Sequence, residues 1–191
     1  PSALNSQIQV TNVSCFGLND GEISVTVSGG TSPYFYSWTS SANTDSTESN
    51  LFAGIDTLTV SDNNGCFFDS IITVNEPIDF AVDILVVDSI DCFGSDNGIL
   101  SASVSPNPND YQYNWVSPIV SNSAVLTDLT TNIYTVVATN ILTGCTDTNS
   151  IDLIEPEELV LTLDSNQQIC IGQTAILTSN VNGGTGVIGY N

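Results

Sequence analysis

The chain repeats itself at a nearly fixed offset, and this repeat constrains its fold more than any other feature. The motif Cys15-Phe16-Gly17 returns as Cys92-Phe93-Gly94, an offset of 77 from 15 to 92. The aromatic set Tyr34, Tyr36 and Trp38 returns at the same offset as Tyr111, Tyr113 and Trp115. A later marker drifts by only two positions, since Glu76-Pro77 returns as Glu155-Pro156. A fixed offset of this size indicates tandem structural units.

A third copy begins after the second. Cys170 follows Cys92 at nearly the same offset, and Gly183-Gly184 follows Gly29-Gly30 at twice that offset. We therefore expect one repeat over residues 1–77, a second over 78–156, and the N-terminal part of a truncated third over 157–191. Proline in each Glu-Pro marker is expected to stiffen a short linker between repeats.

Each repeat is expected to consist of short β-strands. In the first repeat the strands are predicted at Gln7 to Val13, Glu22 to Ser28, Tyr34 to Thr39, Thr57 to Ser61 and Phe67 to Val74. Turn residues such as Asn-Asp-Gly separate them, and no longer segment has the 3.6-residue period of an amphipathic helix. Short strands at this spacing, with an aromatic strand in the middle, favour an immunoglobulin-like sandwich. The predicted fold class is all-β, with tandem immunoglobulin-like domains in an elongated array.

The charge balance excludes whole classes of function. The sequence has no Lys, Arg or His and 21 acids, a formal net charge of -21. Binding to DNA or RNA is excluded because no side chain can replace the phosphate counterions. Phosphate clamps, Schiff bases and Ser-His or Cys-His nucleophiles are excluded as well, because each of them needs a Lys, Arg or His side chain. Apolar residues make up 41% of the chain, enough for a core, and no run approaches the 18 needed for a membrane span.

Four cysteines bracket the first two repeats. Cys15 and Cys66 flank most of the first repeat, and Cys92 and Cys145 flank most of the second. The simplest pairing is within repeats, closing loops that would each contribute roughly 4 kcal/mol in the chain-entropy model. Cys170 would then pair with a partner beyond residue 191. The alternative is reduced, buried thiols. Disulfides would imply an oxidising, extracellular location.

The first repeat resembles a known family. Cys15-Phe16-Gly17, Asn19-Asp20-Gly21, the segment Gly29 to Trp38, and Gly65-Cys66 are similar to the SprB-type repeat of Bacteroidota gliding adhesins. The second repeat replaces the Gly-Gly-Thr turn with Ser105-Pro106-Asn107-Pro108. The start of the third also resembles PKD-like and bacterial immunoglobulin-like domains.

The resemblance implies a very long cell-surface protein exported by the type IX system. Such proteins serve in gliding, adhesion or surface filaments, so the resemblance implies no enzymatic activity. The implied partners are neighbouring repeats of the same chain, with lateral association of chains in a filament as a further candidate.

The aromatic stripe has two interpretations. Tyr34, Tyr36 and Trp38, with their counterparts Tyr111, Tyr113 and Trp115, could form a platform that stacks on the sugars of a surface glycan. Aromatic residues at every second position of a central strand are more often core, and we favour core packing.

Two further kinds of site are candidates. Asp20, Asp62, Asp91 and Asp96 lie in Asn- and Gly-rich turns and carry the oxygen ligands that Ca²⁺ prefers, although aspartate is common in turns without any metal. No other cofactor is expected. Ser46, Thr57, Ser70 and Ser89 each follow an Asp and resemble the O-glycosylation acceptors of Bacteroidota; the alternative is an unmodified hydroxyl on an exposed strand face.

Two functions from different classes remain open at this point. The first is a structural and adhesive stalk made of end-to-end domains. The second is an accessory module of a secreted enzyme that binds glycan or calcium.

The absence of Lys and Arg makes a direct prediction about proteolysis. Trypsin has no cleavage site in residues 1–191, so the chain is expected to survive trypsin even when heated. A protease that cuts after aromatic residues should degrade it once it is reduced and unfolded. Mass spectrometry of both digests checks the prediction, and any tryptic cut within this sequence would contradict it.

Overall fold

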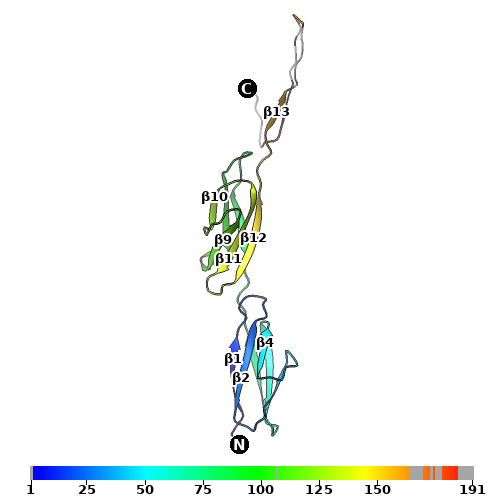
Figure 1. Cartoon of the computed structure of the whole chain (residues 1–191), viewed down its shortest axis with the longest axis vertical. Coiled ribbons are helices and arrows are strands. Elements are labelled where there is room, and N and C mark those ends of the chain that lie inside the picture. The colour runs from blue at the N-terminus through cyan, green and yellow to red at the C-terminus, as the bar shows by residue number, and fades with distance from the viewer. Residues whose placement is uncertain (1, 106, 164–169, 173, 175–177, 185–191) are drawn as a thin grey trace. The chain divides into compact units, whose positions relative to one another are not determined.

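The structure is a computed structural model of the whole chain. It describes all residues except 1, 106, 164–169, 173, 175–177 and 185–191 (Figure 1). The chain divides into two compact units, Pro1–Asp79 and Phe80–Asn191. The regular elements among the described residues are β-strands, with one short 3₁₀ turn at Pro108–Asp110. No helix among them is long and apolar enough to cross a membrane.

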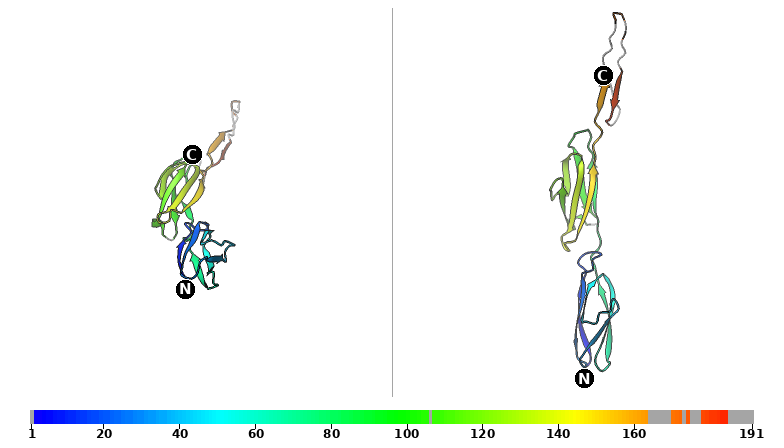
Figure 2. Two further views of the ribbon diagram at one scale, coloured as in Figure 1. Left: turned by 60° about the horizontal axis from the view of Figure 1, so that its bottom comes forward. Right: turned by 45° about the vertical axis from the view of Figure 1, so that its right-hand side comes forward.

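Unit 1 contains six strands in two sheets. The strands are β1 (Asn5–Thr11), β2 (Gly21–Ser28), β3 (Phe35–Trp38), β4 (Thr47–Leu51), β5 (Gly54–Ser61) and β6 (Phe67–Val74). One sheet has the order β1-β2-β4 and the other the order β3-β5-β6, with every pair antiparallel. Figure 2 gives two further views of these strands.

The first part of unit 2, up to Pro156, repeats this arrangement strand for strand. Its strands are β7 (Val82–Asp88), β8 (Gly98–Val104), β9 (Tyr111–Ser117), β10 (Val125–Leu129), β11 (Asn132–Asn140) and β12 (Thr146–Leu153). The sheets are β7-β8-β10 and β9-β11-β12. The repeat in the sequence is therefore a repeat of one fold.

Each unit is a sandwich because both of its sheets contribute to a single core. In unit 1, Ile23 and Val25 of one sheet join Trp38, Leu58 and Val60 of the other in one buried cluster. Unit 2 has the equivalent cluster, centred on a fully buried Trp115. In the notation for immunoglobulin domains the sheets correspond to strands ABE and CFG, with the tryptophan on strand C. The predicted immunoglobulin-like, all-β fold is confirmed.

The sequence-based strands need two corrections. β4 is absent from the predicted strands because Thr-Glu-Ser-Asn-Leu is mostly polar; it forms because Glu48 and Leu51 turn inward and are buried. β5 starts at Gly54 rather than Thr57, since Asp56 occupies an inward position of the strand instead of a turn.

The chain passes through unit 1 from one end to the other. At the first end, β1 begins at Asn5, which pairs with Ser28, and the N–H of Gly30 donates to the carbonyl of Ser2 (3.0 Å). At the opposite end, the N–H of Val13 donates to the carbonyl of Asn75 (2.9 Å), just after β6 ends. The N- and C-terminal ends of the unit are therefore its two opposite poles.

The described part of residues 157–191 contains an antiparallel pair, β13 (Val160–Leu163) and β14 (Ser179–Asn182). The N–H of Gly184 donates to the carbonyl of Glu157 (3.0 Å), as that of Gly30 does to Ser2. This pair therefore reproduces the β1–β2 pair of unit 1. Other parts of the predicted third repeat lie outside the described residues.

Candidate functional site

The aromatic stripe lies in the core. Trp38, Tyr113 and Trp115 are buried, and Tyr34, Tyr36 and Tyr111 pack against the two core clusters. Both indole N–H groups find carbonyl partners: Trp38 Nε1 donates to Asp45 (3.0 Å) and Trp115 Nε1 to Ser123 (2.9 Å). A buried indole with a satisfied N–H has no face left for a sugar, so the stripe serves packing.

The Cys-Phe-Gly loop is held by the Glu-Pro marker of the same unit. The N–H of Gly17 donates to Glu76 Oε2 (2.7 Å), and the N–H of Gly94 donates to Glu155 Oε2 (2.6 Å). The two motifs are far apart in sequence, and nothing in either one alone predicts the contact. Their nearly equal spacing in both repeats is the signal that could have found it. A carboxylate thus fixes the loop at the C-terminal end of each unit.

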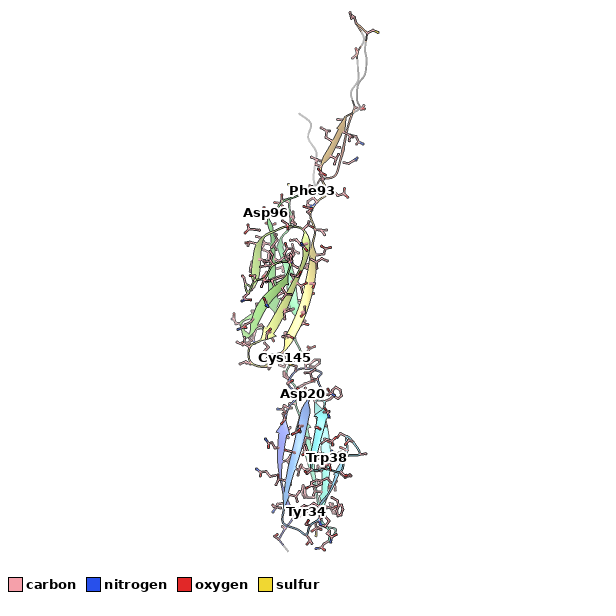
Figure 3. The ribbon with its side chains drawn as sticks, in the orientation of Figure 1. Asp20, Tyr34, Trp38, Phe93, Asp96 and Cys145 are labelled. Atoms are coloured by element: carbon pink, nitrogen blue, oxygen red, sulfur yellow. The ribbon has the colours of Figure 1, made fainter. Side chains whose placement is uncertain are left out.

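Equivalent turns in the two units are stabilised by aspartates at different positions, Asp20 in unit 1 and Asp91 in unit 2. In unit 1 the N–H of Ser14 donates to Asp20 Oδ1 (2.9 Å), and hydrogen bonds from Ser14 lower the pKa of Asp20. In unit 2 the equivalent of Asp20 is Asn97, whose Nδ2 donates to Asp91 Oδ2 (2.7 Å). Asp96 is exposed in the same turn (Figure 3).

Asp62 organises the turn at the other end of unit 1. Its buried carboxylate accepts hydrogen bonds from the N–H groups of Thr31 (3.0 Å), Asn64 (2.9 Å) and Cys66 (2.9 Å). Burial acts to raise the pKa of Asp62, but these backbone hydrogen bonds outweigh it and lower the pKa. Backbone N–H groups therefore stabilise the charged carboxylate in place of Lys or Arg, which this sequence lacks.

The two candidate calcium ligands of unit 1 do not lie together. Asp20 and Asp62 lie at opposite ends of unit 1, while Asp91 and Asp96 belong to unit 2. Among the residues that the structure describes, no group of three or more acidic, histidine or cysteine side chains is arranged to hold a metal ion. Calcium binding stays a prediction.

Asp56 is a buried carboxylate that the sequence marks only as the residue before Thr57 in a candidate glycosylation motif. It accepts hydrogen bonds from the hydroxyls of Thr39 (2.7 Å) and Ser40 (2.6 Å) and from the N–H of Thr57 (2.8 Å). Burial favours a higher pKa for Asp56, but these hydrogen bonds overcome it and lower the pKa. At the equivalent position of unit 2, Tyr134 donates to the carbonyl of Thr130 (2.9 Å), the tyrosine corner of immunoglobulin domains.

The four candidate glycosylation acceptors differ in exposure. Ser46, Thr57 and Ser70 are half-buried in unit 1, whereas Ser89 is exposed just after β7 in unit 2. Ser89 is therefore the most accessible of the four hydroxyls. Modification itself stays a prediction.

The predicted pairing of cysteines within repeats is wrong. Cys15 and Cys145 are disulfide-bonded, whereas Cys66, Cys92 and Cys170 are free thiols. Neither Cys15–Cys66 nor Cys92–Cys145 is therefore formed.

The direction of the last strand of each sandwich explains why the two cysteines of one repeat do not pair. Cys15 lies two residues from Gly17, which Glu76 holds at the end of β6, while Cys66 immediately precedes β6. The length of that strand separates these ends by about 25 Å, whereas a disulfide requires Cα atoms within about 7 Å. In unit 2, Cys145 likewise precedes β12, and Cys92 lies beside the Gly94–Glu155 contact at its far end. Figure 3 shows Cys145 at one end of unit 2 and Phe93 and Asp96 at the other.

One sheet face of unit 1 carries exposed aromatic rings. Phe35, Ser61 and Phe67 form one row across β3, β5 and β6, with Phe35 55% and Phe67 68% exposed. In the next row, the hydroxyl of Thr59 donates to Asp69 Oδ1 (2.6 Å). At the equivalent positions of unit 2 lie Gln112, Thr139 and Thr146. The aromatic row is thus a feature of unit 1 alone.

Residues 8–43 match the family model of the SprB repeat. No match was found among curated proteins. Among solved structures, the amphioxus IgVJ-C2 molecule aligns over 78% of this chain and 95% of its own, with 14% identity and a TM-score of 0.29.

The chain is built of immunoglobulin-like domains, as the strand order in each unit defines. Residues 8–43 of its first domain are similar to the SprB repeat, which is found in cell-surface proteins, and this match confirms the predicted resemblance.

Asp56 gives a testable prediction about the stability of unit 1. Because its folded pKa lies below its unfolded value, the carboxylate stabilises the unit above the unfolded pKa, and this contribution is lost as pH falls through the folded pKa. We expect Asp56→Asn to destabilise unit 1 by about 2 kcal/mol at pH 7. Amide exchange in β5 should then accelerate by roughly thirtyfold, with less effect at pH 3.

Asp69→Asn is the matched control, since it makes the same charge change at an exposed position of the neighbouring strand. Amides of β11 in unit 2 serve as the internal reference. Equal exchange rates in Asp56→Asn and Asp69→Asn would contradict the role assigned to Asp56.

Proposed function

We propose that this chain is a structural segment of a secreted cell-surface adhesin, a stalk of end-to-end domains that holds a binding region away from the cell. The observation that carries the proposal is the path of the chain through unit 1, which begins at one pole and leaves at the opposite one. Domains built this way add length when they are joined in series. A domain whose termini were adjacent would add a side branch.

The SprB repeat and the composition support the same proposal. A repeat of cell-surface proteins occupies residues 8–43. The net charge of -21 without any compensating Lys or Arg makes neighbouring domains repel one another within a Debye length of about 10 Å at 0.1 M salt. Repulsion between like-charged domains favours an extended array. Export by the type IX system and a part in gliding or in a filament extend this proposal.

Small-angle scattering of the 191-residue chain tests the stalk directly. A compact chain of this length has a radius of gyration of about 16 Å. Two units in series, whose strands alone rise about 25 Å each, should give roughly 22 Å or more in 0.15 M salt. A radius of gyration no larger than that of the compact chain, and unchanged by salt, would contradict the proposal.

The aromatic row of unit 1 supports a second candidate function, the binding of a glycan. Exposed Phe35 and Phe67 offer flat apolar faces, and the hydroxyl of Ser61 lies between them. The acidic surface would repel phosphate or carboxylate ligands, so a neutral sugar is the ligand class that fits.

A glycan array tests this second function with a control from the same chain. Phe35→Ala/Phe67→Ala should lower binding to any neutral glycan at least about tenfold, because both stacking faces are removed. Gln112→Ala/Thr146→Ala changes the equivalent positions of unit 2 and should leave binding unchanged. Absence of binding by the unaltered chain would leave the stalk as the function.

A further inference from the structure

Unit 1 contains a cavity of about 390 Å³, bounded by β4, the start of β5 and the loop that follows β3. Its wall combines apolar side chains with serine hydroxyls and two carboxylates, those of Glu48 and Asp56. A cavity of this size is typical of a site for a small ligand. Neither Phe35 nor Phe67 lines it, so the cavity is separate from the aromatic row.

Both carboxylates occupy positions that unit 2 fills with core residues. Glu48 is 6% exposed and Asp56 is 4% exposed. The equivalent residues of unit 2 are Leu126 of β10 and Tyr134 of β11, which both belong to its core cluster. The fold therefore does not require a charge at either position. Burying a charge costs free energy, and natural proteins retain such costly groups mainly where they serve a function.

Glu48 has one carboxylate oxygen that no other group of unit 1 uses. Asn43 Nδ2 donates to Glu48 Oε2 (2.6 Å), and among the described residues no group donates to Oε1. Every described side-chain oxygen that is fully shielded from solvent has a hydrogen-bond partner. Oε1 must therefore be open to solvent, and the cavity that Glu48 lines is where it opens.

Asp56 contributes charge rather than a free acceptor. Its Oδ1 already accepts hydrogen bonds from the hydroxyl of Thr39 (2.7 Å) and the N–H of Ser40 (3.1 Å), and its Oδ2 accepts one from the hydroxyl of Ser40 (2.6 Å). Donors that point at both oxygens leave little room for a metal ion. Calcium takes six to eight oxygen ligands, which a cavity with one available carboxylate oxygen does not provide.

We propose that this cavity binds a primary alkylammonium group, carried by a free amine or by a lysine side chain of another protein. The ammonium donates one hydrogen bond to Glu48 Oε1. Its other N–H groups have acceptors in the hydroxyls of Ser41 and Ser49, which line the same cavity. The alkyl stem lies against the apolar wall formed by Leu51 and Ile55.

A cation fits this cavity better than a neutral or anionic ligand. The chain has no Lys, Arg or His that could neutralise Glu48 and Asp56. A hydrogen bond from an ammonium to a carboxylate is about twice as strong as one between neutral groups, and a partly buried site strengthens it further. Phe52 also lines the cavity and is exposed, so its ring offers a cation–π contact at the opening. Anionic ligands are repelled by both carboxylates.

A titration followed by nuclear magnetic resonance tests the proposal on the isotope-labelled 191-residue chain. The probe is n-butylammonium chloride at pH 7 and constant ionic strength, and n-butanol is its uncharged match. We expect saturable shifts of the amides of Ser49, Phe52 and Ile55, with a Kd of about 1 mM, a reasonable value for so small a ligand. n-Butanol should bind at least about tenfold more weakly, because it lacks the charge.

A second probe separates the two sources of the ammonium group. Nα-acetyl-lysine methylamide carries the same group on a peptide backbone. Saturable shifts of the same amides with this probe would support a lysine side chain as ligand. Binding of n-butylammonium alone would support a free amine.

Two variants of Glu48 test its role, and a third serves as control. Glu48→Gln removes the charge and keeps the shape, while Glu48→Leu introduces the residue type that unit 2 holds at this position. Both should weaken n-butylammonium binding at least about tenfold. Asp69→Asn removes one charge from an exposed position of β6 and should leave the Kd unchanged.

Several results would overturn the proposal. These are the absence of saturable shifts around the cavity in the unaltered chain, equal affinity for n-butanol, and unchanged affinity in a folded Glu48 variant. Saturable binding of calcium at the same amides would overturn it as well, since the cavity would then be a metal site. The comparison of n-butylammonium with n-butanol uses the unaltered chain, so it decides the question even if both Glu48 variants fail to fold. None of these results bears on the stalk.

Discussion

The rest of the structure depends on the direction in which the last strand of each sandwich runs. β6 starts at the N-terminal pole of unit 1 and ends at the C-terminal pole, where the chain leaves the domain. This direction separates the termini, puts the Glu-Pro marker beside the Cys-Phe-Gly loop and places Cys15 and Cys66 about a strand length apart. The same path in unit 2 makes its two cysteines equally distant.

A sequence without cations must satisfy its buried and half-buried carboxylates in another way, and both units use hydrogen-bond donors. Backbone N–H groups serve Asp62, Glu76 and Glu155, and hydroxyls of Thr39 and Ser40 serve Asp56. Hydrogen bonds to a charged acceptor are stronger than those between neutral groups, so each of these carboxylates fixes its turn or loop. The turns at both poles of unit 1 are therefore held by hydrogen bonds to carboxylates.

The repeat offset, the alternation of apolar residues and the aromatic strand are sufficient to predict tandem immunoglobulin-like units. β4 could not be predicted because its strand character comes from burial of Glu48 and Leu51 rather than from its composition. Aspartate is common in turns, so the sequence suggests a turn at Asp56. In β5, however, its side chain is buried together with those of Leu58 and Val60. The cysteine pairing failed because flanking positions in sequence say nothing about strand direction. Assigning directions to the first and last predicted strands would have placed Cys15 and Cys66 at opposite poles.

Pulsed electron paramagnetic resonance tests the central claim that the chain enters unit 1 at one pole and leaves it at the opposite one. Spin labels are placed on cysteines introduced at Ser2 and Asn75, in a chain whose own five cysteines are replaced by Ser. The length of β6 predicts a separation of about 25 Å or more between the two labels. A separation well below this strand length, as for two ends that lie side by side, would contradict the claim.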